Sequence, residues 1–309
     1  MKTKIAIVGT GGVGGFLGGE LAHYYTPGDP EVEIYFISRG EALRNIRANG
    51  LRVDAQTGSF VAIPTLATDS AAAIGPMDYV IYCTKAYDVE SGIEGIRPCI
   101  APHTVIIPFL NGVDSVEKIR TLLPGNEVWY GCVYVVAYIV EPGHVAERTN
   151  GYRYMFGDPE GDPVRQKALA TLFERAGIWA RWMPDIVRRV WDKFAFISTV
   201  ATVTSYTDRT YGEVLGDPTD RASLLALLDE FQAVAKALGK ELSEAISDLV
   251  VQQMERIPGE TTTSMQRDFR AHRPTELESL TGYIVRAGER AGVPTPTYRR
   301  MYESLKKRL

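Results

Sequence analysis

Residues 4–17 read KIAIVGTGGVGGFL, and this stretch decides how the first half of the chain is interpreted. A short apolar run is followed at once by the pattern G-x-G-x-x-G, which Gly9, Gly11 and Gly14 form. An amphipathic stretch then runs to about Tyr25, so the expected order is strand, glycine turn and helix. In this order Gly9 permits the tight turn, Gly11 lets backbone approach a pyrophosphate, and Gly14 lets the helix pack on the strand.

The start of that helix is a candidate binding site for a dinucleotide. The first N–H groups of a helix have no partner within it, and the positive end of the helix dipole attracts phosphate. The alternative is a purely structural turn, because the chain has 29 glycines. We expect the residues of the turn to bind the cofactor, namely Gly9, Thr10, Gly11, Gly12, Val13 and Gly14.

The composition is that of a globular protein with two domains. The chain has 309 residues, of which 45% are hydrophobic and 23% charged, and its formal net charge is −4. With no basic run, we expect neither a nucleic-acid partner nor a membrane partner. Three cysteines and four scattered histidines fit neither a disulfide framework nor a metal site, so no metal is predicted. Without a signal peptide or an apolar run of ~18 residues, the expected location is the cytoplasm.

The order of strands and helices predicts an α/β fold, a Rossmann-type doubly wound sheet followed by an all-helical C-terminal domain. The predicted domain boundary follows residue 183, which makes residues 1–183 a dinucleotide-binding domain and residues 184–309 a helical domain. Residues 51–64 read as a hairpin-like insert. The other expected strands are 33–38, 78–84, 104–109, 128–138, 143–145, 152–156 and 178–182. The expected helices are 42–48, one that follows Val113 and runs to about residue 123, 163–176, 186–205, 218–238, 243–256, 264–270, 276–291 and 298–309.

The end of the second strand bears on the choice of cofactor. An NAD site usually places an acidic residue there, whereas an NADP site places a cation for the 2′-phosphate. Here strand 33–38 is followed by Arg39, and the guanidinium fork suits a phosphate. The sequence therefore favours NADPH. The alternative is that Arg39 simply caps a surface turn.

Two further polar residues follow predicted parallel strands. Lys85 comes after strand 78–84, and Asn111 comes after strand 104–109. Either could be an ordinary turn residue. In open α/β sheets, however, ligands bind beyond the carboxyl ends of the strands, so we expect both to contact the cofactor.

In the helical half, Lys193 is the first candidate for acid–base chemistry. It lies within WDKFAFIS (residues 191–198), among apolar and aromatic neighbours. A lysine desolvated there could exchange a proton near neutral pH. The alternative is a surface lysine paired with Asp192 or Asp185.

Glu276 and Ser264 each have an ordinary structural interpretation. Thr275 and Glu278 have the spacing of a capping box, which would place Glu276 in the first turn of a helix, where acids are favoured. Ser264 has the character of a helix N-cap.

Taken in chain order, these pieces resemble the ketopantoate reductase (2-dehydropantoate 2-reductase) family. The resemblance runs from the glycine motif nearly to the C-terminus, and the ordered set is more specific than the glycine motif alone. The matching segments are Gly9-x-Gly11-x-x-Gly14, Arg39, Thr84-Lys85-Ala86, Asn111-Gly112-Val113, Glu141-Pro142-Gly143, Trp191-x-Lys193, Thr263-Ser264-Met265-Gln266-x-Asp268, Thr275-Glu276 and Gly292-Val293-Pro294-Thr295-Pro296.

The resemblance implies a fold like that of 6-phosphogluconate dehydrogenase and the NADPH-dependent reduction of ketopantoate to pantoate, a step of pantothenate and coenzyme A biosynthesis. Lys193 matches the general acid, and Glu276 matches the acid that holds the substrate and the lysine. Ser264 matches a contact to the substrate carboxylate.

For the cofactor, the resemblance implies that Arg39 and Lys85 are the NADPH-binding cations. Asn111 matches the asparagine near the nicotinamide, where it would contact cofactor and substrate. The partner implied is a small 2-oxo acid, and the helical surface leaves a homodimer open.

Three positions depart from the family pattern. Leu110 replaces the family's usual glutamine, and Ile197 and Ala201 replace asparagines that contact polar groups of the substrate. A site without those amides should discriminate poorly for the polar substrate. One alternative is therefore reduction of a more apolar 2-oxo acid or ketone. Another is an NADPH-binding sensor without turnover.

Overall fold

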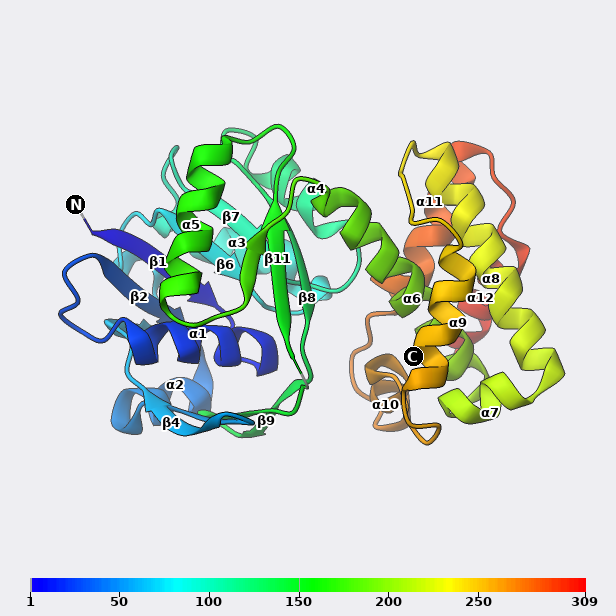
Figure 1. Cartoon of the computed structure of the whole chain (residues 1–309), viewed down its shortest axis with the longest axis horizontal. Helices are drawn as coiled ribbons and strands as arrows, with labels where there is room; N and C mark the ends of the chain where they lie inside the picture. The colour runs from blue at the N-terminus through cyan, green and yellow to red at the C-terminus, as the bar shows by residue number, and fades with distance from the viewer. Residues whose placement is uncertain (1, 150) are drawn as a thin grey trace. The chain divides into compact units, whose positions relative to one another are not determined.

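The structure, a computed structural model, describes residues 2–149 and 151–309, and its contacts divide the chain into two compact units (Figure 1). The first unit comprises the residues up to Leu110 together with Ser115–Ile186, and the second comprises Asn111–Asp114 and Val187–Leu309. The predicted boundary places everything before residue 184 in the first domain. In the structure the loop Asn111–Asp114 packs instead with the helical unit.

A five-stranded parallel sheet forms the centre of the first unit, in the order β5-β2-β1-β6-β7. Because β1 lies in the middle, Ile5 pairs with Ile34 of β2 on one side and with Tyr79 of β6 on the other. The chain winds outward from β1 in both directions, which confirms the predicted doubly wound sheet. The strands are β1 (Thr3–Val8), β2 (Val32–Ile37), β5 (Leu66–Thr68), β6 (Tyr79–Tyr82) and β7 (Val105–Pro108).

Helices cover both faces of this sheet and create two apolar cores. On one face, Phe16 of α1 and Phe173 of α5 pack in one cluster with Phe36 of β2. On the other face, Ile93 of α3 and Ile119 of α4 pack in a second cluster. The helices of the unit are α1 (Gly12–Tyr24), α2 (Gly40–Asn49), α3 (Val89–Ile96), α4 (Ser115–Leu122) and α5 (Pro163–Arg175).

Two smaller sheets complete the first unit, in the orders β4-β3-β10-β9 and β12-β11-β8. The antiparallel pair β3 and β4 confirms the predicted hairpin at 51–64. The single strand expected at 128–138 is wrong, because the structure divides it into β8 and β9, which belong to different sheets. The strands are β3 (Leu51–Ala55), β4 (Gly58–Ala62), β8 (Tyr130–Tyr134), β9 (Ala137–Glu141), β10 (His144–Glu147), β11 (Arg153–Gly157) and β12 (Ala180–Trp182).

The second unit is mostly helical, as predicted. Its centre is an aromatic cluster in which Trp191 and Phe194 of α6 contact Phe231 of α8 and Tyr283 of α11. Helix α7 and a π-helical segment were not expected. The helices are α6 (Ile186–Thr207), α7 (Tyr211–Gly216), α8 (Pro218–Ala237), α9 (Ile246–Arg256), α10 (Ser264–Arg270), the π-helical segment η4 (Glu278–Gly282), α11 (Tyr283–Ala291) and α12 (Pro296–Lys306).

Cys83, Cys99 and Cys132 are free thiols buried in the first unit, so the three cysteines form no disulfide framework. Within the described ranges, none of the helices combines the length and the apolar character that crossing a membrane requires.

Candidate active site

A cavity of about 300 Å³ lies at the carboxyl ends of β1 and β2 in the first unit. Four of the predicted cofactor residues contribute to its wall, namely Gly9, Thr10, Gly11 and Arg39. The hydroxyls of two lining residues, Thr10 and Ser38, lie 2.6 Å apart and are hydrogen bonded. The remaining lining residues are Val8, Ile37, Ser38, Ala42, Asp69, Thr84, Asp88, Ser91, Gly92, Gly95, Ile96 and Ile139.

Each of the three glycines in the turn is suited to its position for a different geometric reason. Gly9 has φ +89°, a conformation that side chains disfavour, and it turns the chain out of β1. A Cβ on Gly14 would stand 2.2 Å from the carbonyl oxygen of Gly9, so only glycine lets α1 pack so closely. A Cβ on Gly11 would meet nothing within 4 Å, which leaves open space beside the turn. The start of α1 has no side-chain cap, so its first N–H groups can serve a ligand.

Arg39 stands at the rim of this cavity as an exposed side chain. Its backbone precedes α2, but its side chain makes no capping hydrogen bond, which argues against the turn-cap alternative. One guanidinium nitrogen, Nη2, lies 3.5 Å from where a Cβ of Gly95 would be. The guanidinium therefore reaches across to α3 at the edge of the cavity.

Two acids that the sequence analysis missed line the same cavity. Asp69 directly follows β5, and Asp88 precedes α3. A carboxylate at such a strand end can accept hydrogen bonds from ribose hydroxyls. An acid that directly follows a strand is the sequence signal that could have pointed to Asp69. Residues 66–68 were not predicted to be a strand, and the position of this strand beside β2 depends on the sheet order, which the sequence does not show.

Lys85 is exposed at the start of a short 3₁₀ turn after β6, and it does not line the cavity, whereas its neighbour Thr84 does. Gly12 and Val13 form the first turn of α1, next to the cavity. The thiol of Cys83, beside Gly9 and Gly14, is no candidate nucleophile, because burial raises the pKa of Cys83 to about 12.

In the second unit, the structure joins three predicted residues into one hydrogen-bonded chain. Lys193 Nζ donates to Asn111 Oδ1 at 3.2 Å, and Asn111 Nδ2 donates to Glu276 Oε2 at 3.2 Å. An ammonium group can only donate and a carboxylate can only accept, so the amide must present its oxygen to the lysine. Asn111 thus connects a cation and an anion that lie 83 residues apart in the chain. We call this arrangement the polar chain.

Different elements position the three members of the polar chain. Asn111 follows β7, and Gly112 turns the loop with φ +90°. Lys193 lies on α6, where Trp191 and Phe194 are buried in the aromatic cluster. With those two side chains fixed in the core, Lys193 is directed to a different face of the helix.

Glu276 is 5% exposed and stands just before η4. Asp192, the acid next to Lys193 in sequence, is hydrogen bonded to Ser243. Its carboxylate accepts hydrogen bonds from the backbone N–H of Ser243 at 2.8 Å and from the Ser243 hydroxyl at 2.6 Å. These bonds weaken the alternative in which Lys193 is merely a surface lysine neutralised by Asp192.

The capping box predicted for Thr275 and Glu278 is not formed. The Thr275 hydroxyl accepts from the N–H of Leu277 at 3.4 Å, while the Glu278 carboxylate accepts from the hydroxyl of Tyr302 at 2.6 Å. Glu278, which a local capping box would have used, is hydrogen bonded instead to Tyr302 on α12. Glu276 therefore precedes the helix instead of lying in its first turn.

The cap predicted at Ser264 is displaced by one residue. Thr263 is the N-cap of α10, and its hydroxyl accepts from the N–H of Gln266 at 3.2 Å. Ser264 is the first helical residue and is exposed. Within residues 2–149 and 151–309, it makes no hydrogen bond to the polar chain.

The three positions that depart from the family pattern lie in different surroundings. Leu110 is buried in the core cluster of the first unit that α3 and α4 cover, and Ala201 is buried within the helical unit. Ile197 is half-buried, one helical turn after Lys193, so it lies on the same side of α6 as the lysine. Of the three, Ile197 is the one that is not fully buried.

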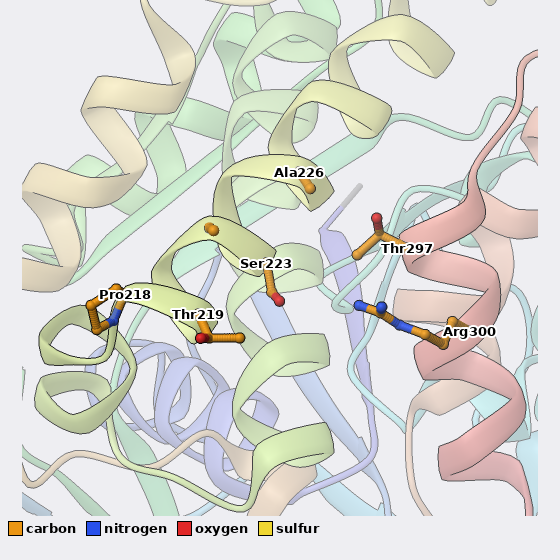
Figure 2. Close-up of a pocket in the computed structure, with 7 residues that line it drawn as sticks. Pro218, Thr219, Ser223, Ala226, Thr297 and Arg300 are labelled. Carbon is orange, nitrogen blue, oxygen red and sulfur yellow. The ribbon is translucent and has the colours of Figure 1, made fainter.

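A second hollow lies between α8 and α12 (Figure 2). Small polar side chains and Arg300 line it, and in Figure 2 the Arg300 side chain extends toward α8. None of the predicted site residues contributes to its wall. Its lining residues are Pro218, Thr219, Ala222, Ser223, Ala226, Thr297 and Arg300.

Comparison with known proteins covers almost the whole chain. The family model described as ketopantoate reductase PanE/ApbA matches residues 5–161, and the model of the C-terminal domain of the same family matches residues 185–308. Together the two models span both units.

Individual relatives agree with the family models. The crystal structure of 2-dehydropantoate 2-reductase from Porphyromonas gingivalis is 36% identical, covers 99% of this chain and 100% of its own, and superposes with a TM-score of 0.87. A 2-dehydropantoate 2-reductase from Mesorhizobium japonicum is 27% identical, over 95% of this chain and 94% of its own.

D-mandelate dehydrogenase, solved with NADH and anilino(oxo)acetate, shares the fold. It is 24% identical, with a TM-score of 0.85 over 99% of this chain and 98% of its own. These matches run through both units, from the glycine turn to the last helices. The chain therefore belongs to the ketopantoate reductase PanE/ApbA family of nicotinamide-dependent oxidoreductases.

Proposed function

We propose that the chain reduces 2-dehydropantoate (ketopantoate) to pantoate with NADPH, as a step of pantothenate biosynthesis. The observation that carries the proposal is the hydrogen-bonded order of Lys193, Asn111 and Glu276. A cationic donor held by an amide and backed by a buried carboxylate is suited to protonating an oxygen that gains negative charge.

The bound nicotinamide would supply a hydride to the carbonyl carbon of the 2-oxo acid. The carbonyl oxygen then carries the negative charge, and Lys193 Nζ gives it a proton, so that an alcohol forms. The neutral amine regains its proton from water. Asn111 fixes the direction of the ammonium group, and the carboxylate of Glu276 holds the amide of Asn111 in place.

Several features support a dinucleotide at the cavity of the first unit. There is open space beside Gly11, an uncapped helix start at Gly12, and a guanidinium at the rim. We propose that Arg39 binds the 2′-phosphate of NADPH and that Asp69 and Asp88 accept hydrogen bonds from ribose hydroxyls. Lys85 would assist from the end of β6.

The remaining roles are proposed by resemblance to the family. Ser264 would contact the substrate carboxylate, and Asn111 would contact both the substrate and the nicotinamide. Residues 184–309 would serve as the substrate and catalytic domain, and residues 1–183 as the NADPH-binding domain. A homodimer and a cytoplasmic location stay predictions.

The test is NADPH oxidation with ketopantoate, with NADH as the control cofactor. We expect kcat/KM above ~10⁴ M⁻¹s⁻¹ with NADPH, which is the ordinary enzymatic range. Equal rates with NADPH and NADH would contradict the proposed role of Arg39. Tight cofactor binding without oxidation on any carbonyl compound would instead favour a sensor that does not turn over.

A second candidate function is the reduction of a more apolar 2-oxo acid. The observation that favours it is Ile197, which lies one turn from Lys193 and offers no hydrogen bond. D-mandelate dehydrogenase, a protein of the same fold, was solved with an anilino-substituted oxoacetate. A panel of 2-oxo acids with aliphatic and aryl side chains separates the two candidates. The second gains support if kcat/KM for an apolar acid exceeds that for ketopantoate by more than ~10-fold.

A further inference from the structure

The helix that follows Glu276 does not begin as a regular α-helix. Residues 278–282 form η4, a π-helical segment, and regular α11 starts only at Tyr283. A π-turn accommodates one residue more than an α-turn, and one residue corresponds to ~100° of rotation about the axis. The direction in which the side chain of Glu276 points, just before this helix, therefore depends on whether η4 keeps its π geometry.

Hydroxyl groups on the buried side of α6 hold this segment. The Ser198 hydroxyl donates to the carbonyl oxygen of Leu280 at 2.8 Å, and the hydroxyls of Thr202 and Thr281 are 2.7 Å apart. The side chains of Ser198, Thr202 and Thr281 are fully buried. Without a partner, a buried carbonyl or hydroxyl would lose hydrogen-bond energy that water cannot replace. These contacts therefore favour the observed register of η4.

Tyr298 of α12 completes the arrangement. Its hydroxyl lies 2.8 Å from Ser198 Oγ. Since Leu280 offers only a carbonyl oxygen, the Ser198 proton points there, and the Tyr298 hydroxyl donates to Ser198. Burial raises the pKa of Tyr298 well above its ordinary value, which keeps this hydroxyl protonated.

The carboxylate of Glu230 on α8 holds Tyr298 in turn. It accepts hydrogen bonds from the backbone N–H groups of Thr297 and Tyr298 at 2.7 and 2.9 Å. The start of α12 is thereby fixed to α8, and the tyrosine that orients Ser198 belongs to that first turn.

The opposite side of η4 faces the loop that carries Asn111. A Cβ on Gly112 would stand 3.5 Å from the carbonyl oxygen of Ser279, so the loop lies directly against the segment. η4 consequently contacts the loop of Asn111 and helix α6, which carries Lys193, and only Leu277 separates it from Glu276. The segment is thus linked to the element that carries each member of the polar chain.

We propose that Ser198 is a positioning residue of the polar chain. It acts through the Leu280 carbonyl to hold η4 in the register that keeps the Glu276 carboxylate hydrogen bonded to Asn111. Loss of the hydroxyl lets η4 relax toward α-helical geometry, which rotates Glu276 away from Asn111 and leaves Lys193 without its fixed orientation. The kinetic part of this inference rests on the proposed reductase function.

The first experiment compares Ser198→Ala with Thr199→Val. Thr199 is equally buried on the same helix, but its hydroxyl donates to Ala195 of its own helix at 2.7 Å. We expect Ser198→Ala to lower kcat by ~10–100-fold, as misplacement of a catalytic group does, and to leave the dissociation constant of NADPH unchanged. Thr199→Val should keep kcat within about 2-fold. Equal losses in both variants, or full activity of Ser198→Ala, would overturn the proposal.

A double-mutant cycle with Glu276→Gln tests the route of the effect. If Ser198 acts through Glu276, adding Ser198→Ala to Glu276→Gln should lower kcat by no more than about 2-fold. Independent, multiplicative losses would contradict the proposal. Ser198→Cys fills nearly the same volume with a weak donor, so it provides a fold-preserving variant for which we expect a smaller loss in the same direction.

A structural measurement separates this inference from the proposed function. If the wild-type chain reduces no 2-oxo acid, the proposed function fails, whatever Ser198 does. A crystal structure of Ser198→Ala still decides the positioning role. We expect the 3.2 Å hydrogen bond between Asn111 and Glu276 to be broken, and an unchanged bond with η4 intact would refute the role.

Discussion

The cavity beside Gly9 and Gly11 and the polar chain of the helical unit are built in different ways. One contiguous turn, residues 9–11, contributes its backbone to the wall of the cavity. The polar chain consists of side chains whose hydrogen bonds span 82 and 165 residues of sequence. A site made from backbone can be recognised in a local motif, whereas a site made from distant side chains exists only after folding. We therefore expect single side-chain changes to abolish chemistry in the helical unit, while the cavity should respond mainly to added volume or altered charge.

The largest effect is expected at Lys193. Lys193→Ala should lower kcat by roughly 10²–10⁴-fold, because a general acid contributes about that factor. The dissociation constant of NADPH should stay within about 2-fold, since Lys193 belongs to the other unit. Lys236→Ala, an exposed lysine of α8, is the matched control and should change neither value. Near-wild-type turnover of the Lys193 variant would remove the lysine from the mechanism.

The glycine turn offers a comparison within the first unit. Gly14→Ala would place a Cβ 2.2 Å from the Gly9 carbonyl oxygen and 2.7 Å from Cys83 Cβ, so we expect a loss of several kcal/mol in the free energy of unfolding. Gly11→Ala meets open space and should cost no more than about 1 kcal/mol. Thermal unfolding of the two variants measures the difference.

Gly11→Ala, which should be the milder of the two variants for stability, should have a clear effect on cofactor binding. The added methyl group of Gly11→Ala would stand where a pyrophosphate approaches the backbone, so NADPH affinity should fall at least ~10-fold while the fold is retained. If Gly11→Ala binds NADPH as tightly as the wild type, the open space beside the turn is not the pyrophosphate site.

Arg39 tests whether charge in the cavity selects the cofactor. Arg39→Ala should raise KM for NADPH by ~10–100-fold, the worth of charge-assisted hydrogen bonds, and leave KM for NADH nearly unchanged. Arg44→Ala on the same helix, α2, is the matched control. Parallel losses with both cofactors would mean that Arg39 does not bind the 2′-phosphate.

The smallest effect is a pH dependence of stability that originates in the first unit. Burial raises the pKa of Glu20 to about 7 from an ordinary value of 4.5, with Glu147 adding repulsion and a hydrogen bond from Tyr152 opposing the shift. The folded state therefore binds a proton that the unfolded state has already released, and stability falls as pH rises from about 5 to 8.

Glu20→Gln should remove this dependence. At pH 8 the variant should be more stable than the wild type by on the order of 1–2 kcal/mol, seen as a higher Tm, and the advantage should vanish near pH 4.5. Glu33→Gln is the comparison, because the pKa of Glu33 is lowered, chiefly by the Tyr35 hydroxyl, and its stabilising charge persists at pH 8. An unchanged pH profile in Glu20→Gln would show that Glu20 does not titrate in this range.

The sequence determined the parts of the molecule whose cause is local. The apolar run before the glycine turn, the helix after it and the helical pattern beyond Asp185 each follow from neighbouring residues, and the structure has all of them. Where the local signal was weak, as at β5 and α7, the element was missed. Where tertiary partners took the side chains of a local motif, as at Glu278, the predicted cap did not form.

The candidate residues could be found in the sequence, but their arrangement could not. Lys193, Asn111 and Glu276 were recognisable as polar residues in distinctive surroundings, and resemblance to a family singled them out. Only the tertiary structure joins Asn111 to the helical unit and places its amide between the lysine and the acid. The π-turn after Glu276 is equally invisible in the sequence, because its geometry is stabilised by hydroxyls on α6 that lie about 80 residues earlier in the chain. Local structure is encoded in contiguous residues, whereas the geometry of this site is set by contacts that exist only when distant segments pack together.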